Sequence, residues 1–281
     1  MSRLMFKLDR KTLETMYFSF VRPKLEYADV VWSNLSEGQS YQIELVQKRA
    51  GRIVSGAIRG TSTDTIYNEL GWSSMEGRRE QHVVLFTHKV LHGNTPKYLR
   101  DTFPDTVHDR TTYDLRNTHD LTLFQTRLVT YYKSLFPHAV RSWNLLEPHL
   151  KSIDDYSKFK EIFLKNLPTT NQLYYYGDRR LAVIHARLRM KCSALKADLF
   201  DNKCIPDSLC SCGHDREDAL HYFFICPLYA RERINLQDVV IEHTNFNLHT
   251  VLYGRQDLSF STNCIIFDAV HNFIKATKRF D

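Results

Sequence analysis

Apolar residues in the first hundred positions recur at helical spacing. Behind a capping Asp9, one face carries Leu13, Met16, Tyr17, Phe20 and Val21, which follow the i, i+3, i+4, i+7 rule. Pro23 ends this helix and is placed to open a second one. The second helix would bury Leu25, Ala28, Val31 and Trp32. A third helix is expected from about Tyr41, and a fourth from Ser74 to a glycine stop at Gly93.

The middle of the chain is less regular. Residues 103–126 are rich in threonine and turn formers, which predicts a loop with at most a short hairpin. Helical spacing returns at 137–146, 156–167 and 263–278, and a Pro-Thr-Thr-Asn run marks a boundary at 168–171. The pattern predicts a mainly α protein with two domains, residues 1–170 and 171–281, and at most short β-hairpins.

The composition is that of an ordinary globular protein with a mild positive balance. The 281 residues carry a net charge of +6 and include six cysteines. A positive balance favours anionic partners, nucleic acid above all, although a solvated surface gives the same number. No stretch approaches the roughly 20 apolar residues of a membrane span, and the N-terminus is not a secretory signal. We expect an intracellular protein of the nucleus or cytoplasm, without a membrane partner and with its oligomeric state left open.

The cysteines cluster late in the chain. Cys210 and Cys212 flank one residue, His221 follows after eight, and Cys226 after four more. Three thiolates and one imidazole form a closed tetrahedral set for structural Zn²⁺, and Gly213 helps the chain turn back. The alternative is a core turn with reduced thiols.

Other metal and catalytic patterns are weaker. His214 is a competing ligand, and Cys204 is a spare thiol. His88 and His92 are four apart on one predicted helix, but nothing nearby completes a metal set. No glycine-rich phosphate loop or hydrolase elbow occurs.

An ordered series of short blocks resembles jockey-like non-LTR retrotransposon reverse transcriptases over nearly the whole chain. The segment after their polymerase core is similar to FVRPKLEYA at 20–28 with VW at 31–32. ELVQKRA at 44–50, RR at 78–79, GNTP at 93–96, FP at 136–137 and FK at 159–160 follow in order. WN at 143–144 departs from the family, because its proline comes one residue late. RLR at 187–189, the cysteine cluster and LYG at 252–254 look like the cysteine-rich tail.

The resemblance implies a helical thumb-like and linker region followed by a small zinc-knuckle domain. These polymerases bind two metal ions with adjacent aspartates, whereas here Tyr27-Ala28-Asp29 is followed by Val30. We interpret Asp29 as a helix-face residue, and we expect no polymerase or endonuclease centre and therefore no enzyme activity. The palm domain of the parent enzyme would be a missing partner upstream, and an enzyme fragment that acts only with a supplied palm is a further hypothesis.

A basic segment precedes the cysteine cluster. It contains Arg179, Arg180, Arg187, Arg189 and Lys191, and a tyrosine run at 174–176 could stack on bases. From the residues alone, a solvated helix face beside core tyrosines fits equally well. With the resemblance, we predict RNA or DNA binding through this basic zinc-knuckle region. The alternative is a domesticated or decaying remnant that acts as a protein-interaction or structural module.

Overall fold

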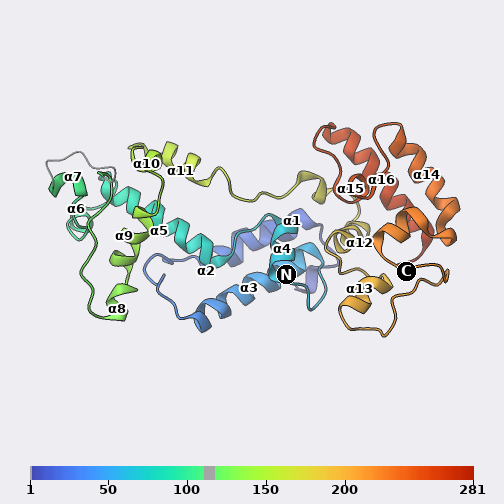
Figure 1. The fold of residues 1–281 in the computed structure, drawn as a ribbon, viewed down its shortest axis with the longest axis horizontal. Coiled ribbons are helices and arrows are strands. Elements are labelled where there is room, and N and C mark those ends of the chain that lie inside the picture. The colour runs from blue at the N-terminus through green and yellow to red at the C-terminus, as the bar shows by residue number, and fades with distance from the viewer. Residues whose placement is uncertain (1, 111–117) are drawn as a thin grey trace. The chain divides into compact units, whose positions relative to one another are not determined.

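Serine and aspartate side chains start many of the helices in the computed structural model, which describes residues 2–110 and 118–281 (Figure 1). Asp9, Ser62, Ser74, Asp155 and Ser259 each accept a hydrogen bond from a backbone N–H three residues on, which satisfies a donor that the helix leaves free. Regular structure in the described residues is helical apart from two isolated bridges, Thr106 with Leu121 and Leu209 with Arg216. The mainly α prediction is confirmed.

The chain forms two compact units that interleave in sequence. Unit 1 comprises residues 1–20, 48–72 and 169–281, and unit 2 comprises 21–47 and 73–168. One unit boundary lies close to the expected division at residue 170. However, residues 1–20 and 48–72 belong with the C-terminal segment, because their side chains complete its packing.

Unit 1 is built around α16, which packs against α14, α12 and α15 (Figure 1). Its core includes Leu188, Tyr222, Phe223, Phe267 and Phe273. Its elements are η1 (Ser2–Leu4), α1 (Arg10–Met16), the π-helical η2 (Tyr17–Val21, whose last residue falls in unit 2), the C-terminal part of α3 (Glu37–Ser55), α4 (Thr63–Leu70), η3 (Gln172–Tyr175), α12 (Arg179–Arg189), α13 (Lys196–Asp201), the π-helical η4 (His221–Ile225), η5 (Pro227–Tyr229), α14 (Ala230–Ile241), α15 (Leu248–Tyr253) and α16 (Phe260–Thr277).

Unit 2 is built around α5, which packs against α9, α11 and α6. Val83, Val84, Trp143 and Phe159 lie in its core. Besides the N-terminal part of α3, its elements are α2 (Arg22–Leu25), α5 (Met75–Leu91), α6 (Lys97–Arg100), α7 (Val107–Arg110), α8 (Val129–Tyr132), α9 (Leu135–Asn144), α10 (Pro148–Lys151) and α11 (Tyr156–Leu164).

The predicted second helix begins with Pro23 in its first turn, as expected, but the prediction that it continues to Trp32 is wrong. α2 ends at Leu25, and residues 26–34 form turns in which Ala28 has φ +53° and Val31 is exposed. The indole N–H of Trp32 donates to the carbonyl oxygen of Tyr27 and closes this turn. Asp29 lies in these turns and is therefore not a helix-face residue. Its buried carboxylate accepts a hydrogen bond from the His82 ring, 2.6 Å away.

Other predicted helices are present. The third and fourth helices are present as α3 and α5, α16 covers the final one, and Gly93 has φ +72°. The pattern missed α4, which begins after Ser62 and ends at Gly71. Of the irregular stretch 103–126, residues 111–117 lie outside the described residues, and the Thr106–Leu121 bridge joins its two sides.

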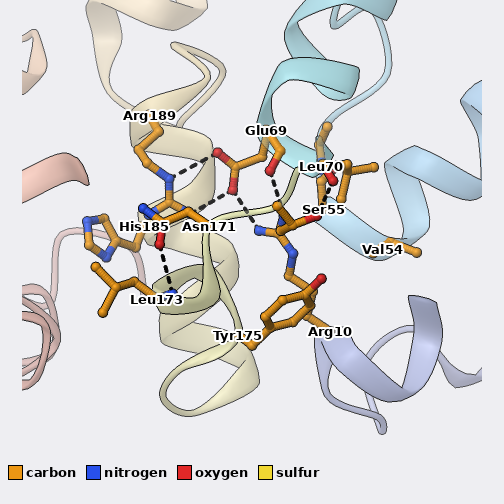
Figure 2. Close-up of polar contacts among 12 residues, drawn as sticks. Arg10, Val54, Ser55, Glu69, Leu70, Asn171, Leu173, Tyr175, His185 and Arg189 are labelled. Carbon is orange, nitrogen blue, oxygen red and sulfur yellow. Dashed lines mark hydrogen bonds and ion pairs between the residues drawn. The ribbon is translucent and has the colours of Figure 1, made fainter. Parts of the chain in front are cut away.

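A buried ion cluster joins three helices of unit 1 (Figure 2). Glu69 on α4 accepts hydrogen bonds from Arg10 on α1 at 2.7 Å and from Arg189 on α12 at 2.7 and 3.0 Å. All three residues are less than 10% exposed. Burial alone raises the pKa of Glu69, but the two arginines outweigh it and the net pKa shift is downward. The charged carboxylate is thus the counterion of two buried guanidinium groups.

Glu69→Gln should lower the free energy of unfolding by about 3–5 kcal/mol, because it leaves two buried cations without a counterion. Urea denaturation at pH 7 measures the loss. Asp257→Asn, which breaks the exposed Arg255–Asp257 pair, is the control and should leave stability unchanged. Equal stability of Glu69→Gln and wild type would contradict this account of the cluster.

Two buried histidines meet in the core of unit 1. His185 Nδ1 and His271 Nε2 lie 3.3 Å apart, and His185 Nε2 lies 2.9 Å from the carbonyl oxygen of Val251. Burial lowers the pKa of His185 well below its usual value and that of His271 to about 4. Both rings are therefore neutral in the folded protein at neutral pH.

Because these buried rings stay neutral in the folded protein, the free energy of unfolding should decrease as the pH is lowered. Between pH 6.5 and about 4 the unfolded chain binds protons that folded His271 does not bind, so the contribution is present above pH 6.5 and is lost as the pH decreases. We expect the free energy of unfolding, measured by urea denaturation, to decrease from pH 7 to pH 5 in wild type. In His271→Gln this decrease should be smaller by about 2 kcal/mol. The exposed His249→Gln should retain the wild-type drop, and an equal drop in His271→Gln would refute the assignment.

Candidate metal centre

The first two cysteines lie on a tight turn. The Leu209–Arg216 bridge closes it, and the Cys210 N–H donates to the Asp215 carbonyl oxygen at 2.8 Å. Gly213 donates back to the Cys210 carbonyl at 2.9 Å and has φ +78°. A side chain is strained in that left-handed conformation. The turn therefore brings the side chains of Cys210 and Cys212 to the same place.

The other two donors come from the segment that follows. His221 begins the π-helical turn η4, where its backbone N–H donates to Asp218 Oδ1 at 2.8 Å. Cys226 ends the turn with its N–H on the His221 carbonyl, and Arg233 donates to the Cys226 carbonyl at 2.6 Å. Between the ligands, Tyr222 and Phe223 are fully buried in the unit 1 core. The core thus fixes the helix that carries His221 and Cys226.

The four donor atoms surround one point. All lie within 4.8 Å of one another, with 3.7 Å between the sulfurs of Cys210 and Cys226 and 3.3 Å between Cys212 Sγ and His221 Nε2. Sulfurs about 2.3 Å from a tetrahedral zinc ion are separated by about 3.8 Å. The buried Nδ1 of His221 has no hydrogen-bond partner among the residues that the structure describes, so the ring is oriented by packing and by whatever Nε2 binds. This donor set fits a metal ion such as zinc.

Burial disfavours ionisation of the cluster thiols unless a cation is bound between them. Burial raises the pKa of the Cys210 thiol to about 12 and also raises that of Cys226. Burial opposes ionisation of Cys212 as well, but backbone hydrogen bonds from His214 and Asp215 make its net pKa shift downward. Thiolates buried this close together repel, and a bound dication removes the cost of ionising them.

The remaining cysteines and histidines lie outside the cluster. Cys192 and Cys264 are buried, as expected for small apolar residues, and Cys204 and His214 are exposed. His88 is buried with its Nε2 2.7 Å from the Ile153 carbonyl, and His92 stacks on it. In the described part of the chain, the Cys3His cluster is the one group of this kind.

The ion pair between Glu217 and Arg279, next in sequence to the segment that carries His221, was not predicted from the sequence. Buried Glu217 accepts hydrogen bonds from Arg279 at 2.6 Å and from the Lys196 N–H at 2.9 Å. Burial raises the pKa of Glu217, but the Arg279 hydrogen bond and charge outweigh it, and the net shift is downward. A lone acidic residue before a helix carries no signal of a partner 62 positions away.

Three of the five predicted nucleic-acid contacts are used inside unit 1. Arg189 pairs with Glu69 (Figure 2). Its guanidinium also lies over the Tyr174 ring, 3.9 Å from the centroid, so we remove it from the predicted contacts. Half-buried Arg179 donates to the carbonyls of Ile53 and Val54, and Arg187 to that of Gly56, each at 2.8 Å. Cations are favoured at such free carbonyls because a helix ends with unpaired acceptors there.

The other two predicted contacts face solvent. Arg180 is exposed in an ion pair with Asp281, and exposed Lys191 lies just beyond α12 with φ +51°. The three rings of the tyrosine run are half-buried, and Arg10 lies over the rings of Tyr174 and Tyr175. The hydroxyl of Tyr175 donates to Glu14, and that of Tyr176 to Asp268.

No family model, curated protein or solved structure matches this chain. Among the described residues, no helix combines the length and the apolar character that a bilayer span requires.

The purified protein should contain one zinc per chain. Elemental mass spectrometry after gel filtration measures the content, and Cys210→Ser and Cys226→Ser should each lose it, because three ligands hold zinc far more weakly than a closed set of four. Metal binding is also folding energy, so a chelator should lower the melting temperature of unit 1. Cys204→Ser is the matched control and should keep its zinc. Retention in both ligand variants would exclude the site.

Proposed function

We propose that this protein binds RNA or DNA as a non-enzymatic, zinc-containing segment that corresponds to the C-terminal region of a non-LTR retrotransposon reverse transcriptase. Two observations support the proposal. The short blocks occur in family order along nearly the whole chain. The Cys3His donors, which the resemblance places in the tail, meet around one point. The convergence of these donors is the observation that carries most weight.

The role we assign to zinc is structural. With three sulfurs and one imidazole nitrogen in place, no coordination position is left for a substrate or water. Zinc would join the turn at Cys210 to the helix at His221, whose neighbours Tyr222 and Phe223 lie in the core. The chain's own residues would then bind phosphate by hydrogen bonds and charge.

Exposed cations of unit 1 are the residues available for phosphate. They include Arg180, Lys191, Lys203, Arg216 and Arg231. Arg180 and Arg216 form surface ion pairs with Asp281 and Asp201. Exposed pairs of this kind contribute little to stability, so a phosphate can replace the carboxylate. Arg179, Arg187 and Arg189 are not part of this surface, because backbone carbonyls or Glu69 occupy them.

The double variant Arg180→Gln/Lys191→Gln should bind nucleic acid more weakly than wild type. Fluorescence anisotropy with a structured RNA and with duplex DNA, across a salt series, measures the affinity. Each lost phosphate contact should reduce the log–log salt slope for duplex DNA by about 0.9. Arg255→Gln, which removes one positive charge elsewhere in unit 1, is the control. Absence of RNA and DNA binding at low salt would refute the proposal.

A protein-interaction module is the second candidate. Apolar side chains around the ligands are about half exposed, and they are Leu220, Ile225, Leu228 and Ile234. Exposed apolar groups close together are typical of a surface that a partner covers. This function requires the same zinc-stabilised fold but no nucleic acid, so zinc retention without RNA or DNA binding would favour it.

A further inference from the structure

Unit 2 contains a cavity of about 600 Å³. Its walls come from α5 and α11, both labelled in Figure 1, and from the chain between Arg22 and Val30. The α5 residues that line it recur at helical spacing from Arg78 to Lys89, so one face of that helix forms a continuous wall. On α11, Tyr156 and Lys160 lie one turn apart.

The cavity lining is strongly cationic. It contains Arg22, Arg78, Lys89, Lys160 and the imidazole of His82, and no carboxylate. Another cavity of unit 2 has the opposite character, because Glu37, Glu44, Glu76 and Glu80 line it together with Arg79. The positive lining is thus specific to the cavity between α5 and α11. Low-dielectric walls strengthen the field of such a lining on an anion.

Carboxylates outside the lining hold part of this charge in position. Glu26 accepts hydrogen bonds from Nε of Arg22 and from Nε of Arg78. Buried Asp29 lies 2.6 Å from Nδ1 of His82, and this hydrogen bond raises the pKa of His82. The arrangement orients two guanidinium groups and an imidazole before any ligand binds, which reduces the entropic cost of binding.

The two lysines have no such counterion within the described ranges, 2–110 and 118–281. Lys89 lies over the Tyr156 ring with its Nζ 4.5 Å from the ring centroid, and Lys160 is exposed. No carboxylate among the described residues forms an ion pair with either lysine. Both ammonium groups are therefore available to an anion, and Phe86, Leu85 and Leu164 add an apolar wall next to them.

We propose that this cavity binds a phosphate-bearing ligand of nucleotide size. Its volume lies within the range of small-ligand sites, roughly 300–1,000 Å³. Arginine and lysine are the side chains that recognise phosphate, and the apolar and aromatic wall suits a base or sugar. The phosphate could belong to a free nucleotide or to a nucleic-acid backbone. The site lies in unit 2, apart from the zinc cluster, and does not depend on the proposed function of that region.

Isothermal titration calorimetry at low salt, with the whole 281-residue chain, tests the site. The probes are ATP without divalent metal, tripolyphosphate, and a ten-residue single-stranded deoxythymidine oligonucleotide. In Lys89→Gln/Lys160→Gln, the dissociation constant for any probe that wild type binds should increase about tenfold or more, because two charged hydrogen-bond donors are lost. Lys158→Gln/Lys165→Gln removes the same charge at two exposed lysines outside the cavity lining, so it is the matched control and should bind as wild type does. Melting curves check that the variants fold.

The probes distinguish the source of the phosphate. Binding of ATP or tripolyphosphate that depends on the two lysines supports a nucleotide site. Lysine-dependent binding of the oligonucleotide alone assigns the same chemistry to a nucleic-acid backbone. Failure of every probe to bind wild type, or equal binding by wild type and the double variant, overturns the inference. That result leaves the proposed function intact if RNA binding still responds to Arg180 and Lys191.

Discussion

The packing of unit 1 depends on the buried ion pairs of the Glu69 carboxylate. This carboxylate neutralises Arg10 and Arg189, which are 59 and 120 positions away along the chain. An unpaired buried guanidinium costs several kcal/mol, so α1, α4 and α12 must pack together for the three charges to be buried at all. This requirement explains why residues 1–20 and 48–72 belong to the same unit as the C-terminal segment. It also determines which way the basic helix α12 faces.

The features that could be predicted from the sequence are those whose determinants are close along the chain. The Asp9 and Ser74 caps act on N–H groups three residues away, and the four metal donors lie within 17 consecutive positions, from Cys210 to Cys226. Short loops between ligands leave few ways to arrange them. The helical class, the ends of α5 and the convergence of the Cys3His set therefore followed from local pattern and residue chemistry.

The features that could not be predicted depend on distant partners. The spacing of Arg179, Arg187 and Arg189 on a helix is the same whether they face water or protein, and nothing near them indicates Glu69 or the carbonyls at the end of α3. The apolar residues after Pro23 show helical spacing, yet Ala28 takes a left-handed conformation, and the chain turns so that buried Asp29 reaches His82. Tertiary contacts override weak local propensity in this segment.

The same rule for basic side chains holds within each unit. A cation becomes structural where a buried carboxylate or a free carbonyl reaches it, and it stays available for a ligand where no carboxylate reaches it or where its ion pair is exposed. In unit 1, Glu69 forms ion pairs with two arginines, and backbone carbonyls at the end of α3 accept hydrogen bonds from two more. Most arginines of α12 therefore stabilise the fold. In unit 2, Glu26 and Asp29 orient their partners from outside the cavity, while no carboxylate in the described part of the chain forms an ion pair with Lys89 or Lys160. Residual charge after internal pairing, and not the count of basic residues, therefore locates the surfaces that an anion can use.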